Sequence, residues 1–182
     1  MRTVIVYESM YGNTRVIAEA IGRGLGPENS TVVVPVARAH RELLDGADLV
    51  VVGGPTHVHG LSRAATRRSA REAAHKPGSG LTMDPGAEGP DLRDWFATLG
   101  RVDAAAAAFD TRLDAPAMFT GRASKVIARL LRRHGCTIAA EPESFLVTNH
   151  NQLRAGEEDR ACAWGRQLAG RAAGQLRMRP VS

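Results

Sequence analysis

The chain has 182 residues, 43% of them hydrophobic and 24% charged, which is the size and balance of one globular domain with its own core. No run approaches the roughly 20 apolar residues of a membrane span, and the first residues resemble a strand instead of a secretory leader. We therefore expect a cytoplasmic protein. The net charge of +5 predicts attraction to acidic partners. Cys136 and Cys162 lack a Cys-x-x-Cys or Cys/His pattern, which argues against a metal site or a disulfide framework.

Short β-branched runs alternate with helical patterns along the chain. The alanine run at 104–110 has the propensity of a helix, but its position between two helical patterns predicts a strand. This alternation predicts βαβ units and a parallel sheet covered on both faces, hence a single three-layer, doubly wound α/β domain over 1–182. The predicted strands are 3–9, 31–36, 48–55, 104–110 and 136–147, and the predicted helices are 13–25, 41–46, 91–100, 121–135 and 157–176.

The loop "SMYGNT" at 9–14 joins the first predicted strand to the first helix. Ligands of open α/β sheets bind beyond the carboxyl ends of the strands, where this loop lies. Ser9, Asn13 and Thr14 offer hydroxyl and amide groups, Gly12 lets the backbone approach closely, and the helix directs free N–H groups toward the loop. These features suit a phosphate group. The alternative is that the three polar side chains only cap the helix.

Residues 5–21 resemble the flavodoxin signature, in which an apolar pair and an aromatic precede a hydroxyl residue, a small residue, a threonine, an alanine and an aliphatic. The resemblance covers about 3–176 and leaves 61–90 unmatched. It implies a flavodoxin-like, five-stranded parallel sheet of order 2-1-3-4-5 and noncovalently bound FMN, held in part by the whole loop with Met10 and Tyr11. The matching residues are Ile5, Val6, Tyr7, Ser9, Gly12, Thr14, Ala18 and Ile21.

A second loop, "GGPTHVHG" at 53–60, follows the third predicted strand and resembles the flavodoxin loop that covers one face of the flavin. The resemblance places His57 where the family often stacks an aromatic, and it implies that Thr56 reaches the phosphate. The alternative for the two histidines is solvated loop residues, and an H-x-H pair alone predicts no metal. The residues expected to contact the cofactor are Pro55, Thr56, His57, Val58, His59 and Gly60.

The segment 61–90 does not follow the strand and helix rhythm. A possible helix over 62–74 is followed by a Gly/Pro-rich stretch, so we expect an insertion that is partly helical or flexible. Loops of this length are usually functional or disordered.

A third loop, "FDTRLDAP" at 109–116, resembles the flavodoxin loop after strand four less closely, because it lacks the usual stacked tyrosine. The resemblance implies that Asp110, Thr111 and Arg112 shape the pyrimidine end of the flavin, with Arg112 as a planar, charged lid. The alternative is a surface ion pair between Asp110 and Arg112. Phe119 is the nearest aromatic. Positive charge on His57 or Arg112 would stabilise an anionic reduced flavin and give a less negative potential than that of an acidic flavodoxin.

The resemblance implies an FMN-dependent electron carrier, because no side chain stands out as a catalytic acid, base or nucleophile. The alternative is a flavoenzyme of the quinone reductase or protoporphyrinogen oxidase type, in which the insertion covers the flavin. A third interpretation is a domain that has lost the flavin, since both stacking positions depart from the family pattern.

The segment "GRASKVIARLLRRHG" at 121–135 holds Arg122, Lys125, Arg129, Arg132 and Arg133 without an acid. We therefore expect an acidic redox partner, with a solvated basic face as the alternative. Nucleic acid is disfavoured because the basic segments lack interleaved aromatics and known DNA-binding patterns. The sequence leaves the oligomeric state open.

Overall fold

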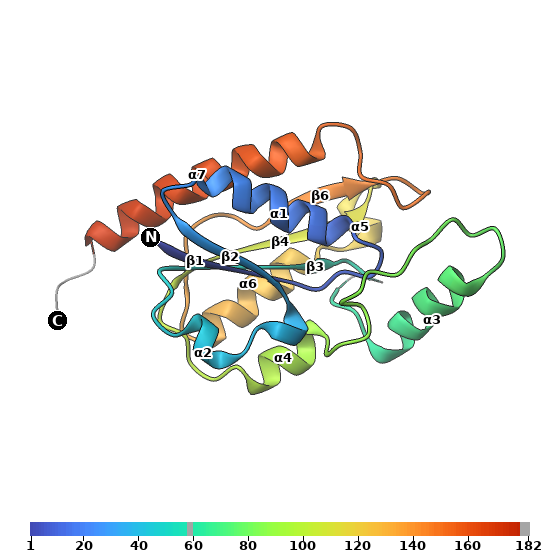
Figure 1. The fold of residues 1–182 in the computed structure, drawn as a ribbon, viewed down its shortest axis with the longest axis horizontal. Helices are drawn as coiled ribbons and strands as arrows, with labels where there is room; N and C mark the ends of the chain where they lie inside the picture. The colour runs from blue at the N-terminus through green and yellow to red at the C-terminus, as the bar shows by residue number, and fades with distance from the viewer. Residues whose placement is uncertain (58–59, 179–182) are drawn as a thin grey trace.

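The computed structural model describes residues 1–57 and 60–178, and a parallel sheet forms its middle layer (Figure 1). The strand order β2-β1-β3-β4-β5 confirms the predicted flavodoxin-like order, and β6 pairs with β4 as well. None of the helices in the described ranges is both long and apolar enough to cross a membrane. The strands are β1 Arg2–Tyr7, β2 Ser30–Pro35, β3 Leu49–Pro55, β4 Ala105–Leu113, β5 Thr137–Ile138 and β6 Glu143–Val147.

The segment predicted as the fifth strand forms two short strands beside β4. β5 pairs with Ala105 and Ala106, and β6 pairs with the far half of β4, from Phe109 to Leu113. Pro142 lies between them and has no N–H group to donate to a ladder, which accounts for the break. The alanine run forms β4 as predicted, because strands pair with it on both sides and leave its side chains buried.

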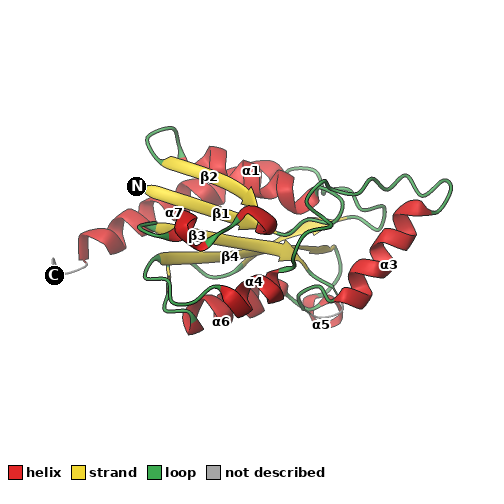
Figure 2. Ribbon diagram, turned by 60° about the horizontal axis from the view of Figure 1, so that its bottom comes forward, coloured by secondary structure: helices red, strands yellow, loops and turns green. Residues whose placement is uncertain are grey.

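Helices cover both faces of the sheet (Figures 1 and 2). Side chains alternate along each strand, so Ile5 packs under α1 and α7 while Val4 and Val6 face α4 and α6. The five predicted helical segments form. The chain adds the short η1 and α5, and α3 projects past the carboxyl ends of the strands. The helices are α1 Asn13–Leu25, η1 Val36–Arg38, α2 Arg41–Leu44, α3 Ala64–His75, α4 Leu92–Thr98, α5 Ala117–Thr120, α6 Ala123–Arg133 and α7 Glu157–Met178.

The insertion 61–90 consists of α3, close to where a helix was predicted, and a long loop that returns to α4. Buried Glu8, just after β1, bonds to the chain at the start of the insertion and just after its end. One carboxylate oxygen accepts from the Ser62 hydroxyl and the other from the Leu92 N–H, at 3.0 Å. Arg67 donates to backbone carbonyls at the end of the returning loop, and Arg93 donates to the Ser62 carbonyl at 2.9 Å. The insertion is therefore tied to the sheet at both ends.

Glycines let α1 and α7 cross at close range. A Cβ on Gly165 would meet the Ile21 carbonyl oxygen, and a Cβ on Gly24 would meet the Cys162 carbonyl oxygen. Gly170, on the same helix as Gly165, is exposed and has no atom near the position of a Cβ.

We expect Gly165→Ala to lower the free energy of unfolding by about 1–3 kcal/mol, because backbone cannot move aside for the methyl group. Gly170→Ala is the matched control and should raise it by roughly 0.5–1 kcal/mol, since alanine favours a helix over glycine. Urea unfolding of both variants measures the difference. Equal shifts in the two variants would contradict the close crossing.

Glu8 gives a pH-dependent prediction. Burial raises the pKa of Glu8 above its ordinary value, against the lowering effect of the hydrogen bonds from Ser62 and Leu92. The folded state therefore holds this proton more tightly than the unfolded state, so the stabilisation from Glu8 is complete below its ordinary pKa and is lost as the pH rises through the folded pKa.

Urea unfolding from about pH 4 to pH 7 should show wild type losing stability relative to Glu8→Gln as the pH rises. Glu8→Ala should cost about 1–3 kcal/mol because it leaves the buried Ser62 hydroxyl and Leu92 N–H without their acceptor. A difference between wild type and Glu8→Gln that stays constant with pH would show that Glu8 does not titrate in this range.

Candidate functional site

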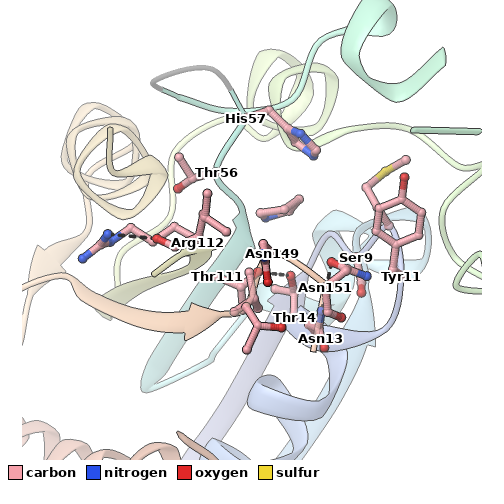
Figure 3. A pocket seen from close by; sticks show the side chains of 15 residues that line it. Ser9, Tyr11, Asn13, Thr14, Thr56, His57, Thr111, Arg112, Asn149 and Asn151 are labelled. Carbon is pink, nitrogen blue, oxygen red and sulfur yellow. Dashed lines mark hydrogen bonds between the residues drawn. The ribbon is translucent and has the colours of Figure 1, made fainter. Parts of the chain in front are cut away.

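A cavity of about 260 Å³ lies at the carboxyl ends of the strands, where the loops after β1, β3, β4 and β6 meet (Figure 3). Of the residues predicted for the site, Gly12, Gly60 and Asp110 do not line it, and Val58 and His59 lie outside the described residues. The predicted residues that do line it are Ser9, Met10, Tyr11, Asn13, Thr14, Pro55, Thr56, His57, Thr111 and Arg112.

The loop 9–14 leaves the start of α1 open toward this cavity. Gly12 adopts a left-handed conformation with φ of 93°, which a side chain would strain, and its N–H donates to Ser9 Oγ at 3.1 Å. The first backbone bond of the helix runs from the Val16 N–H to the Gly12 carbonyl, so the N–H groups of the first turn have no acceptor within the helix. The residue before α1 makes no side-chain capping bond in the described structure. That residue is Gly12, which has no side chain, so the first-turn N–H groups of α1 stay open to a ligand.

Two side-chain contacts join this loop to distant parts of the chain. The Thr14 and Thr111 hydroxyls lie 2.8 Å apart, buried between α1 and β4. Asn13 Nδ2 donates to the Asn151 carbonyl at 2.9 Å. Asn151 has φ of 57°, a left-handed conformation that asparagine tolerates better than most residues. These contacts fix the start of α1 against the other loops of the site.

Two predicted site residues support the neighbouring helix α6. Thr56 Oγ1 accepts from the Ala123 N–H at 2.9 Å, and Asp110 Oδ2 accepts from the Ser124 N–H at 2.7 Å. Asp110 is fully buried, and burial raises its pKa against the lowering effect of the Ser124 hydrogen bond. The alternative of a surface ion pair between Asp110 and Arg112 is wrong, because Asp110 faces the first turn of α6. Thr56 lines the cavity and Asp110 does not.

His57 and Arg112 bring less positive charge to the cavity than the sequence predicted. The His57 ring points into it (Figure 3), and burial lowers the pKa of His57, so the ring is neutral at pH 7. Its Nε2 has no partner among the described residues. The Arg112 guanidinium points away and donates to the Ala115 carbonyl at 2.6 Å. The structure therefore does not support a cavity made cationic by these two residues. The alternative interpretation of His57 as a solvated loop residue is also wrong, because its ring is largely buried.

The insertion supports the outer side of loop 9–14. The Tyr11 hydroxyl donates to the Ala70 carbonyl on α3 at 2.8 Å, and Met10 packs against Ala70 in a small apolar cluster. The Asp84 N–H donates to the Met10 carbonyl at 2.8 Å, and the Asp84 carboxylate pairs with Arg15 at 2.9 Å. Tyr11 and His57 also line a second hollow of about 440 Å³ beside α3.

Sequence reasoning missed the loop after β6, which contributes uncharged side chains to the cavity. The segment "VTNHNQ" at 147–152 is polar and follows the last strand, so the rule that ligands bind beyond the carboxyl ends would have indicated it. The residues that line the cavity without having been predicted are Leu113, Val147, Thr148, Asn149 and Asn151.

The cavity residues fit a phosphate ester that carries a flat ring. Free N–H groups and the positive end of the α1 dipole favour an anion without a cationic side chain. The hydroxyl and amide groups beside them are uncharged. The His57 ring stands across the cavity from Asn13 and Thr14, and the Tyr11 ring lies beside Ser9 (Figure 3).

Comparison with known proteins agrees with this geometry. The flavodoxin family model matches residues 5–93. No curated protein sequence matches the chain. Among solved structures, an archaeal flavodoxin superposes with a TM-score of 0.64 at 20% identity, over 95% of this chain and 99% of its own. Flavodoxin 1 of Bacillus cereus gives 0.63 at 15% identity, over 93% and 98%.

A flavodiiron protein from Giardia intestinalis gives a TM-score of 0.62 at 18% identity, over 97% of this chain but 37% of its own. Identities this low show a shared fold. The match to the flavodoxin family model over residues 5–93 and the fold shared over nearly the whole chain show that this protein has the flavodoxin-like fold.

Proposed function

We propose that the protein binds FMN noncovalently in this cavity and carries electrons to and from redox partners. The observation that carries the proposal is the open start of α1, whose N–H groups face the cavity beside Ser9, Asn13 and Thr14. Bound FMN would supply one-electron or hydride chemistry.

The chain's own residues bind and orient the cofactor. Ser9 holds the Gly12 N–H and so fixes the shape of the loop, while Asn13 and Thr14 line the phosphate end. Tyr11 and neutral His57 offer ring faces to a flat ligand, and the insertion shields Tyr11 from the outer side through the Ala70 contact. The neutral lining favours an uncharged ring over an acidic or basic one.

The visible spectrum of the purified protein tests FMN binding directly. We expect flavin absorbance bands as isolated, or their perturbation when FMN is added to cofactor-free protein. A protein that shows neither, with a folded circular dichroism spectrum, would sink the proposal.

Asn13→Asp tests the phosphate end. A carboxylate there should weaken FMN binding about ten- to a hundredfold, because it repels the phosphate and replaces a donor by an acceptor. Binding of riboflavin, which has no phosphate, should change far less. The acid suits the start of a helix, so the fold should be retained. Fluorescence titration measures both affinities.

Gln167→Glu is the matched control, since it adds the same charge on the exposed surface of α7. It should leave both affinities within about twofold. An Asn13→Asp variant that loses FMN and riboflavin equally would show that the phosphate does not lie at this loop.

A flavoenzyme with a substrate of its own is the second candidate. The hollow that α3 forms with Tyr11 and His57 would give such a substrate a place beside the cavity, against an uncharged lining. Turnover of a quinone or a porphyrinogen with a reduced nicotinamide, in the absence of a reductase protein, is expected only for this candidate. Reduction that requires a reductase protein is expected of the carrier.

A further inference from the structure

Helix α6 divides sharply into an apolar and a cationic face. Ile127 and Leu131 are fully buried against the sheet. Arg122, just before the helix, donates hydrogen bonds to the Pro142 carbonyl and the Ser144 hydroxyl. The residues at positions i, i+4, i+7 and i+8 share the opposite face. They are Lys125, Arg129, Arg132 and Arg133, all exposed, and no carboxylate of the described chain pairs with any of them.

The first two cations of this row, Lys125 and Arg129, do not stabilise the helix. Like charges four residues apart, such as Lys125 and Arg129, destabilise a helix by roughly 0.2–0.5 kcal/mol. Lys125 also lies in the first turn, next to the positive end of the helix dipole, where a cation is unfavourable. Only Arg132 and Arg133, in the last turn, complement the dipole.

The row on α6 differs from the arginines that begin two other helices, because no acid lies on the same helix. Arg15 of α1 pairs with Glu19 at 3.2 Å, and Arg41 of α2 pairs with Asp45, just after that helix, at 2.8 Å. A partner with surface carboxylates would supply the counter-charge that α6 lacks.

Exposed apolar side chains lie between this row and the cavity. α5 directly precedes α6, and its Met118 and Phe119 are 82% and 71% exposed, more than any other large hydrophobic side chain of the described residues. Leu113, 44% exposed, lines the cavity itself. Figure 2 shows α5 near the carboxyl ends of the strands, close to the start of α6. Methionine and aromatic residues are enriched at the core of protein interfaces, with charged residues at the rim.

We propose that α5 and the cationic row of α6 form the docking surface for an acidic redox protein. Met118 and Phe119 make the apolar contact beside the cavity, and Lys125, Arg129 and the two arginines beyond them face the partner's carboxylates. The proposal rests on the proposed function, because a partner seated there comes next to the electron-carrying ligand.

The test measures binding of an acidic plant-type [2Fe–2S] ferredoxin to the full-length protein by calorimetry, at about 20 and 200 mM salt. We expect binding that weakens steeply with salt, as screening of opposed surface charges requires. Lys125→Glu/Arg129→Glu should raise the Kd at least tenfold at the lower salt. Phe119→Ala should raise it several-fold at both salt concentrations.

Arg171→Glu/Arg177→Glu is the matched control, because it makes the same change in net charge on α7, across the sheet from α6. It should change the Kd less than threefold. Equal weakening by the two double variants, no binding of the ferredoxin, or tighter binding of a short DNA duplex than of the ferredoxin would each overturn the proposal. FMN affinity, measured separately in each variant, tells a failure of docking from a failure of the cofactor site.

Discussion

The whole site depends on the parallel register of the central strands. Because β1, β3 and β4 run in the same direction, the loops that follow them open at one edge of the sheet. The Thr14–Thr111 contact lies at that edge and joins residues 97 positions apart in the chain. The start of α1 is then surrounded by hydroxyl and amide groups while its own N–H groups stay free, an arrangement that suits an anion without a cationic side chain.

The insertion acts on this site from outside. Glu8 directly precedes the loop 9–14 and accepts from Ser62, at the start of the inserted segment, and from Leu92, just after its end. Tyr11 and Arg15 hold the middle of the insertion through Ala70 and Asp84. These contacts make the insertion a support for the loop 9–14 instead of a free appendage.

The cavity and the surface of α6 differ in how much positive charge they expose. Inside the cavity, burial keeps His57 neutral and Arg112 is bound to backbone carbonyls, so the ligand would meet dipoles instead of full charges. On the surface, α6 carries a row of exposed cations with no acid on the same helix. The exposed positive charge of α6 thus lies outside the cavity, on the surface that we propose as the docking site.

The sequence by itself determined the layers, the strand order and the loop 9–14, because hydrophobic periodicity and the signature residues are local features. Most of the residues that line the cavity were named from the sequence, through the loops after β1 and β3. The sequence could not decide which partners the polar side chains bond to. Asp110 and Thr56 accept from the first turn of α6, and Arg112 donates to Ala115. These partners come together only when the helices pack on the sheet. Only the tertiary structure decided three further features, because each depends on the same long-range packing. They are the break before β6, the contact of Asn151 with Asn13, and the anchoring of the insertion by Glu8.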